Sequence, residues 1–174
     1  LITGTKAWHF ANTKNNQWKN SLKQQIKNHT YSQKVFISFG EIDCRKDEGI
    51  LSYSLKYKKD FTEVTKSTII GYINYMESNL PKAFTKRYYF GVPAPVLLSS
   101  DIDDIDLKRK DLIQLFNNIM KEEVVSRDRF FIDNYTLTAN DKGWNNNKHM
   151  CDNFHLSPKC LPILLEKHLY KSNT

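Results

Sequence analysis

Cysteine is scarce in this chain, and a long apolar run is missing. The three cysteines, Cys44, Cys151 and Cys160, are too few for a disulfide scaffold, so we expect reduced thiols, with a Cys151–Cys160 bridge as the alternative. No apolar stretch approaches the roughly 18 residues of a membrane-spanning helix, and no signal peptide is recognisable. The sequence therefore predicts a cytoplasmic protein without a membrane span.

Clustered basic charge is also missing, although the chain is basic. Lys and Arg total 26 against 19 Asp and Glu, which gives a formal net charge of +7. The lysines are dispersed among asparagines and form no compact basic block. Dispersed charge is a weak footprint for nucleic acid, so we do not expect nucleic-acid binding. An anionic or sugar-bearing substrate remains compatible with this balance.

What is present is an alternation of helical and strand patterns. Hydrophobic residues make up 40% of the sequence, enough to fill the core of a single domain over residues 1–174. Helical spacing predicts helices over 16–29, 61–80, 107–125 and from Pro158 toward Tyr170. Short apolar runs predict buried strands at 35–39, 88–92 and 129–133. We therefore expect an α/β domain with a mainly parallel sheet between two layers of helices.

Ligands of such sheets bind beyond the carboxyl ends of the strands. Two segments are predicted to lie there: residues 40–48, and the Asn-rich residues 134–157, of which 134–153 are expected at the surface.

Asp152 and His155 lie three residues apart where the second segment meets the last predicted helix. At this spacing the carboxylate can bind one imidazole nitrogen and leave the other free as a base, which is the orienting pair of a serine-hydrolase triad. The alternative is an acidic helix start beside an ordinary surface histidine.

The first segment contains Gly40-Glu41-Ile42-Asp43-Cys44-Arg45 directly after a predicted strand. Gly40 permits a tight turn and a close approach of the backbone to a ligand. Arg45 is suited to bind a carboxylate or to pair with Asp43. A capped loop with an internal ion pair is the alternative.

Together these two motifs resemble the SGNH (GDSL-type) serine hydrolases. The likeness rests on a strand ending in Gly-x-x-Asp and on a distant Asp-x-x-His-Leu-Ser at the last helix. The block from Gly40 to Arg45 is similar to a subgroup of bacterial and related proteins, often encoded near carbohydrate-modifying genes. The segment Ile2–Ala7 is similar to the stretch preceding that block.

The resemblance implies a three-layer α/β/α fold of flavodoxin type and ester hydrolysis or acyl transfer without a metal. No cofactor is predicted, and the expected substrate is an ester or an O-acetyl carbohydrate. It implies His155 as the general base and acid, Asp152 as its orienting partner, and a contribution of Gly4 to the oxyanion hole. Gly40, Glu41, Asp43 and Arg45 are its other implied oxyanion or substrate-binding residues.

Two features depart from the family pattern. The nucleophilic Gly-Asp-Ser block is absent from residues 1–174. Ser38 lies inside a predicted strand and Ser99-Ser100 in a predicted loop, and neither has the elbow context that positions a nucleophilic serine, so neither is proposed as the nucleophile. Because the first strand is central in this fold, we expect that a βα unit carrying the serine precedes Leu1, where the chain lacks an initiator Met. A sheet without that strand has exposed edges that invite a protein partner or an oligomer.

The second departure is Ile42, which occupies the slot where the family usually has an oxyanion-binding Asn. Losing one such donor typically costs about 10²–10³ in turnover. A catalytically inactive domain that binds carbohydrate or a protein is therefore the competing interpretation.

A metal site is a further alternative, because five candidate ligands fall in one short stretch. They are His149, Cys151, Asp152, His155 and Cys160. Their spacing fits no standard zinc pattern, so no metal is predicted.

Overall fold

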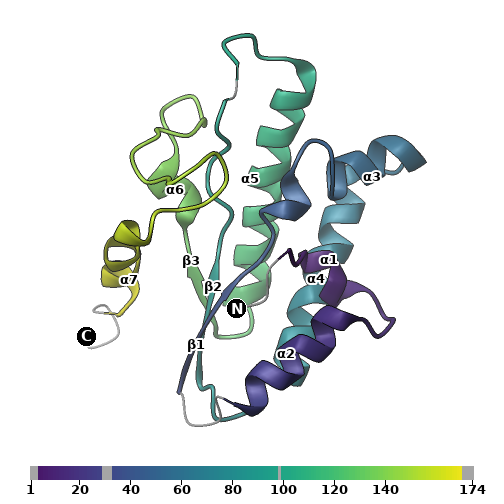
Figure 1. The fold of residues 1–174 in the computed structure, drawn as a ribbon, viewed down its shortest axis with the longest axis vertical. Coiled ribbons are helices and arrows are strands. Elements are labelled where there is room, and N and C mark those ends of the chain that lie inside the picture. Colours follow the sequence, from purple (N-terminus) through teal and green to yellow (C-terminus); the bar gives the residue numbers. More distant parts are fainter. Residues whose placement is uncertain (1–3, 29–32, 98, 170–174) are drawn as a thin grey trace.

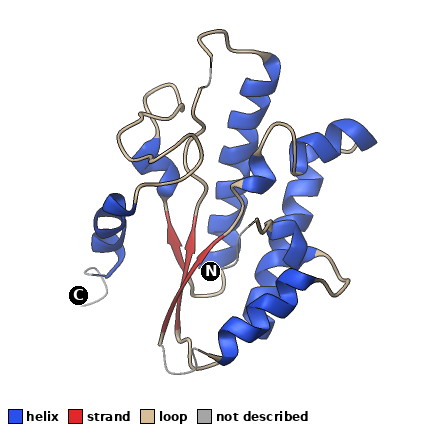
Figure 2. Ribbon diagram, in the orientation of Figure 1, coloured by secondary structure: helices blue, strands red, loops and turns tan. Residues whose placement is uncertain are grey.

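Three parallel strands form the centre of the computed structural model, which describes residues 4–28, 33–97 and 99–169. They are β1 (Lys34–Ser38), β2 (Lys86–Phe90) and β3 (Phe130–Ile132), in the spatial order β1-β2-β3. Figure 2 shows these strands side by side with helices around them. Among the described residues β1 pairs on one side alone, with β2, and Phe36 on this edge strand is 45% exposed.

Helices cover both faces of the sheet, which confirms the predicted three-layer α/β architecture. The first layer contains α1 (Ala7–Ala11), α2 (Gln17–Lys27), α3 (Ile50–Tyr57), α4 (Phe61–Asn79) and α5 (Asp104–Val125). The opposite side carries α6 (Asn134–Thr138) and α7 (Leu161–Leu169), separated from the first layer by the sheet in Figure 1. Two hydrophobic clusters, one on each face, match this division.

The strand alternation explains the two clusters. Tyr89 of β2 packs in the large cluster against Tyr72 of α4, while its neighbours Tyr88 and Phe90 belong to the small cluster beside α7. Successive side chains of a strand point to opposite faces, so one strand serves both cores.

The long helices begin where the sequence provides caps. The Asp60 carboxylate accepts hydrogen bonds from the N–H groups of Thr62 and Glu63 at the start of α4. Asp103 forms a capping box with Asp106 at the start of α5. Each cap satisfies amide groups that have no partner within the helix.

Several element boundaries differ from the prediction. The helices α1 and α3 were not predicted, because five and eight residues are too short for a clear period. Pro158 starts a short 3₁₀ turn, Pro158–Cys160, and α7 follows it. The expected end at Tyr170 lies outside the described residues.

The expectation of a surface loop over residues 134–153 is wrong in part. Asn134 and Asn145 are buried, and their amide groups donate hydrogen bonds to the carbonyls of Gly91 (2.7 Å) and Ala94 (2.9 Å). The segment after β2 has no strand partner at this point among the described residues, so side-chain amides satisfy its backbone. The asparagines are therefore structural.

Asn117 of α5 also satisfies the backbone of the segment after β2 with its side-chain amide. Its side-chain oxygen accepts from the N–H of Val92 (2.7 Å), and its amide nitrogen donates to the carbonyl of the same residue (2.8 Å). This residue, Asn117, is buried and thus pairs with Val92 as a neighbouring strand would.

Candidate active site

Asp152 and His155 form a hydrogen-bonded pair in the loop before α7. The distance between Oδ2 of Asp152 and Nδ1 of His155 is 2.7 Å, so the pairing expected from their spacing is present. The other carboxylate oxygen of Asp152 accepts from the N–H groups of Phe154 and His155, each at 2.7 Å. The carboxylate thereby fixes both the turn and the ring, and Nε2 of His155 remains available.

These hydrogen bonds also determine the charge of the carboxylate. The hydrogen bond from His155, followed by those from the backbone N–H groups, lowers the pKa of Asp152 to about 2. The carboxylate is therefore ionised above that pH, the state in which it can stabilise an imidazolium. Both side chains are accessible, with 66% of His155 and 51% of Asp152 exposed.

Phe154 connects this turn to the Gly40–Arg45 segment. The Arg45 guanidinium lies 4.6 Å from the centre of the Phe154 ring. The ring also bounds a hollow of ≈ 10 Å³, together with Glu41 after β1 and Ala94 after β2. The structure therefore brings the two predicted motifs together at the carboxyl ends of β1 and β2.

Arg45 pairs with acidic neighbours, and the suggested pairing with Asp43 is wrong. Its Nη2 lies 2.7 Å from Oε2 of Glu41, and its Nη1 lies 3.0 Å from Oε1 of Glu48. Glu48 in turn pairs with Lys6 at 3.0 Å. These four side chains form a partly exposed row between α1 and the η1 turn (Ile42–Cys44).

Asp43 points inward and holds the start of α1. Its carboxylate accepts from the N–H groups of Ala7 (2.6 Å) and Trp8 (3.1 Å), and its side chain is fully buried. Burial raises the pKa of Asp43 to about 6, partly opposed by these hydrogen bonds. Gly4 lies three residues before this helix start.

No protein-family model matches the sequence, and no curated protein is significantly similar to it. Solved structures do match the fold. A GDSL-like lipase from Bacteroides thetaiotaomicron aligns with a TM-score of 0.58 at 15% identity, over 98% of this chain and 74% of that chain. The protein has the SGNH hydrolase fold. A candidate acylhydrolase from Bacteroides fragilis gives the same TM-score and identity, over 97% and 72% of the two chains.

The two glycines predicted for the site, Gly40 and Gly4, differ in their surroundings. Gly40 is buried at a φ of +117°, and a Cβ there would lie 2.6 Å from the Phe116 ring. Its close neighbour on the Cβ side is thus a side chain of α5, and the approach of a ligand to its backbone stays a prediction. Gly4 is exposed at a φ of +64°, and a Cβ at this position would have no neighbour within 4 Å among the described residues.

Arg109 of α5 was missed by the sequence analysis. It is 6% exposed, its guanidinium lies 6.0 Å from the centre of the Phe154 ring, and its Nε has no hydrogen-bond partner among the described residues. Arg109 lies three residues before Leu112, on the buried face of α5. A charged residue at such a position is unusual, so the spacing could have identified Arg109 as a candidate. Burial lowers the pKa of Arg109, and nearby Glu41 opposes this effect.

Other candidate groups are placed as follows. Cys44 and Cys160 are buried thiols and Cys151 is exposed, without a disulfide among them.

No cluster of three or more metal-ligating side chains occurs in the described part of the chain. No helix within that part is long and apolar enough to cross a membrane. Among the described residues, the one hydrogen bond of the His155 ring is to Asp152, and no serine contacts it.

Proposed function

We propose that this chain is an SGNH-type hydrolase that cleaves ester substrates by a Ser-His-Asp mechanism. The observation that carries the proposal is the 2.7 Å hydrogen bond between Asp152 and Nδ1 of His155 in an exposed turn at the carboxyl ends of the strands. This arrangement leaves Nε2 of the ring to accept a proton.

The serine of the triad is proposed to lie outside residues 1–174. Nε2 of His155 takes the proton of its hydroxyl as the oxygen attacks the ester carbonyl, and the imidazolium then protonates the leaving alcohol. Water then attacks the acyl-enzyme while Nε2 of His155 takes its proton. The imidazolium passes this proton to the serine oxygen as the carboxylic acid leaves, which returns His155 to its neutral form. Asp152 stays ionised throughout and stabilises the imidazolium.

The oxyanion requires donors other than a side chain at position 42, because Ile42 has none to offer. We assign the backbone N–H of the Gly4 segment to this role, held by Asp43 and by the Lys6–Glu48 ion pair. O-acylated carbohydrates are the proposed substrates. The two fold neighbours, a lipase and a candidate acylhydrolase, are consistent with ester chemistry in general.

The test is active-site labelling of the native protein with a fluorophosphonate, followed by mass spectrometry of the labelled peptide. We expect label on a serine outside residues 1–174, and loss of labelling in His155→Ala with an unchanged circular dichroism spectrum. Label on Ser38 or Ser100 would contradict the placement of the nucleophile.

Absence of label in the native protein would favour the competing function, an inactive domain of this fold that binds carbohydrate or protein. Undiminished ester turnover in His155→Ala would exclude His155 as the base.

A further inference from the structure

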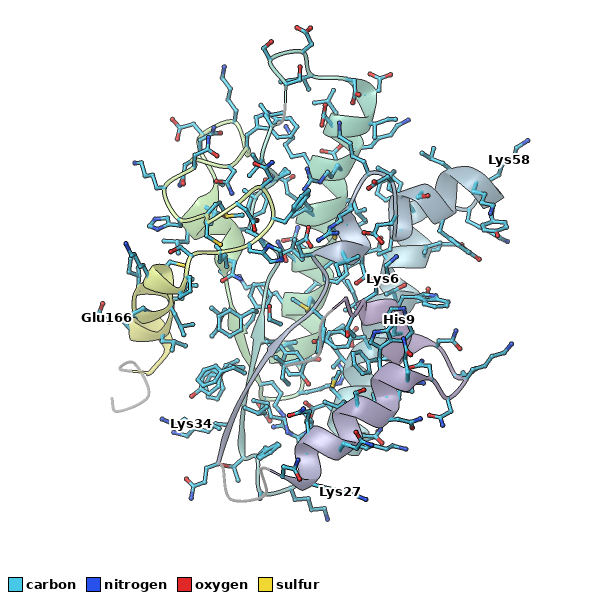
Figure 3. All side chains as sticks on the ribbon, in the orientation of Figure 1. Lys6, His9, Lys27, Lys34, Lys58 and Glu166 are labelled. Carbon is cyan, nitrogen blue, oxygen red and sulfur yellow. The ribbon has the colours of Figure 1, made fainter. Side chains whose placement is uncertain are left out.

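A second and larger hollow lies away from the one beside Phe154. A cavity of ≈ 660 Å³ opens between α1, α3 and α4, next to the buried Asp43. Figure 1 shows these three helices together on one side of the sheet, and in Figure 3 the labelled Lys6 lies where they meet. A volume of this size accommodates a small organic ligand.

Two aromatic side chains at this cavity are unusually accessible. Trp8 of α1 is 48% exposed and Tyr53 of α3 is 45% exposed, although both line the cavity. Exposed aromatic rings that share one cavity are typical of a binding surface. Flat rings with one polar atom suit the apolar face of a sugar ring.

The polar side chains of the cavity balance in charge. The lysines Lys6 and Lys59 are equal in number to the carboxyl groups of Asp43 and Glu63. Of these four, Lys6 also pairs with Glu48, and Asp43 is held by the backbone of α1. Asn12 adds a neutral side-chain amide to the same lining. A balanced set of donors and acceptors disfavours an anion and a cation alike, and suits a neutral ligand with many hydroxyl groups.

Side-chain contacts connect the cavity with the candidate active site. Lys6 lines it and pairs with Glu48, which pairs with Arg45, whose guanidinium lies over Phe154 beside His155. A chain of three direct contacts thus links the cavity to the Asp152–His155 turn. A ligand too large for one site would extend across this row.

We infer that the cavity binds the neutral sugar rings of a saccharide ligand, with Trp8 and Tyr53 stacked on them. The inference rests on the proposed function, in which His155 takes part in cleaving an ester. It adds to that function a place where the carbohydrate part of the substrate binds. A fatty acyl chain is the competing ligand, because Ala11, Ile50 and Val64 add apolar lining to the same cavity.

The test is a titration of the purified protein with cellotetraose, maltotetraose and chitotetraose, followed by the indole N–H resonances in NMR. We expect the Trp8 resonance to shift with at least one of these probes and the buried Trp144 resonance to stay in place. Tyr53→Ala should weaken binding by about tenfold, as for a residue at the centre of a binding site.

Leu55→Ala is the matched control, since Leu55 is 54% exposed on the same helix but does not line the cavity. The affinity of this variant should stay within about twofold of the wild type. A Trp8 resonance that is unmoved by all three probes at about 20 mM overturns the inference, as does binding of decanoate or tetragalacturonate alone.

Binding is measured without turnover, so the two proposals fail separately. Sugar binding without fluorophosphonate labelling would support the saccharide site and contradict the proposed hydrolase activity. Labelling without sugar binding would do the opposite.

Discussion

Oδ2 of Asp152 and Nδ1 of His155 lie 2.7 Å apart in a turn that leaves both side chains in water. A carboxylate in this position accepts a hydrogen bond from Nδ1–H and thereby fixes which tautomer the ring adopts. Because the pair is exposed, we expect it to affect chemistry far more than stability.

Asp152→Asn should therefore lower the turnover of the active protein by about 10⁴, since an amide can hold the ring in the wrong tautomer. The midpoint of thermal unfolding should change little. The measurement is kcat for ester hydrolysis together with a melting curve. Asp47→Asn, an exposed acid in the neighbouring loop, is the control and should leave kcat unchanged.

Asp43 makes stability depend on pH in an unusual direction. Its folded-state pKa is raised to about 6, above the ordinary value, so the folded protein holds the proton more tightly than the unfolded chain. Its contribution is present below about pH 4 and is lost as the pH rises through 6, by about 3 kcal/mol for a shift of this size.

Urea unfolding of the wild type and of Asp43→Asn should reveal this slope. The stability advantage of the wild type over the variant should shrink between about pH 4 and pH 7. A difference that is constant over this range, or that grows, would show that Asp43 is ionised in the folded protein throughout.

His9 predicts the opposite slope. Its Nδ1 accepts from the N–H of Lys6 at 3.0 Å, and its ring stacks on Trp18 with the centroids 3.5 Å apart. Burial, followed by the charge of Lys6, lowers the pKa of His9. Since the folded state favours the neutral ring, this contribution is present above about pH 6.5 and is lost as the pH falls.

We expect wild type to lose more stability than His9→Gln when the pH is lowered from about 7.5 to 5, because glutamine retains an acceptor and does not titrate. Between about pH 7.5 and 9 the two should run in parallel. A titration of the His9 ring followed by NMR provides the independent check, with a midpoint below that of a model peptide.

Gly40→Ala and Gly4→Ala form a matched pair. Both positions have positive φ, but a Cβ at Gly40 would overlap the Phe116 ring at 2.6 Å, whereas the surroundings of Gly4 are open. Gly40→Ala should cost about 2–4 kcal/mol through strain and overpacking, and Gly4→Ala about 1 kcal/mol. Equal costs in denaturant unfolding would mean that Phe116 moves aside freely.

The sequence predicted the α/β layers because its long helices carry a clear period and its strands are short apolar runs. Tyr72, Ile73 and Met76 fell on the predicted stripe of α4 and are buried. It also placed Asp152 and His155 within reach of each other, since three residues at a turn leave few other arrangements. Their catalytic roles remain predictions.

Other features of the site depend on contacts across the chain, which spacing does not reveal. The partner of Asp43 is the backbone of α1, 35 and 36 residues away, so the local pairing with Arg45 was the wrong choice. The exposed surfaces of Trp8 and Tyr53 face one cavity because α1 and α3 both pack on α4, and neither short helix was predicted.

The pairing of Asn117 with Val92 ties the backbone that follows β2 to the movements of helices. The amide of Val92 donates to Asn117 on α5, and the amide of Ala94 donates to the hydroxyl of Thr138 on α6. Neither amide can meet solvent until one of these helices moves, although the strand itself has ended at Phe90. Hydrogen exchange of these two protons therefore reports the opening of helices, and this segment shares their slow exchange rather than that of a loop.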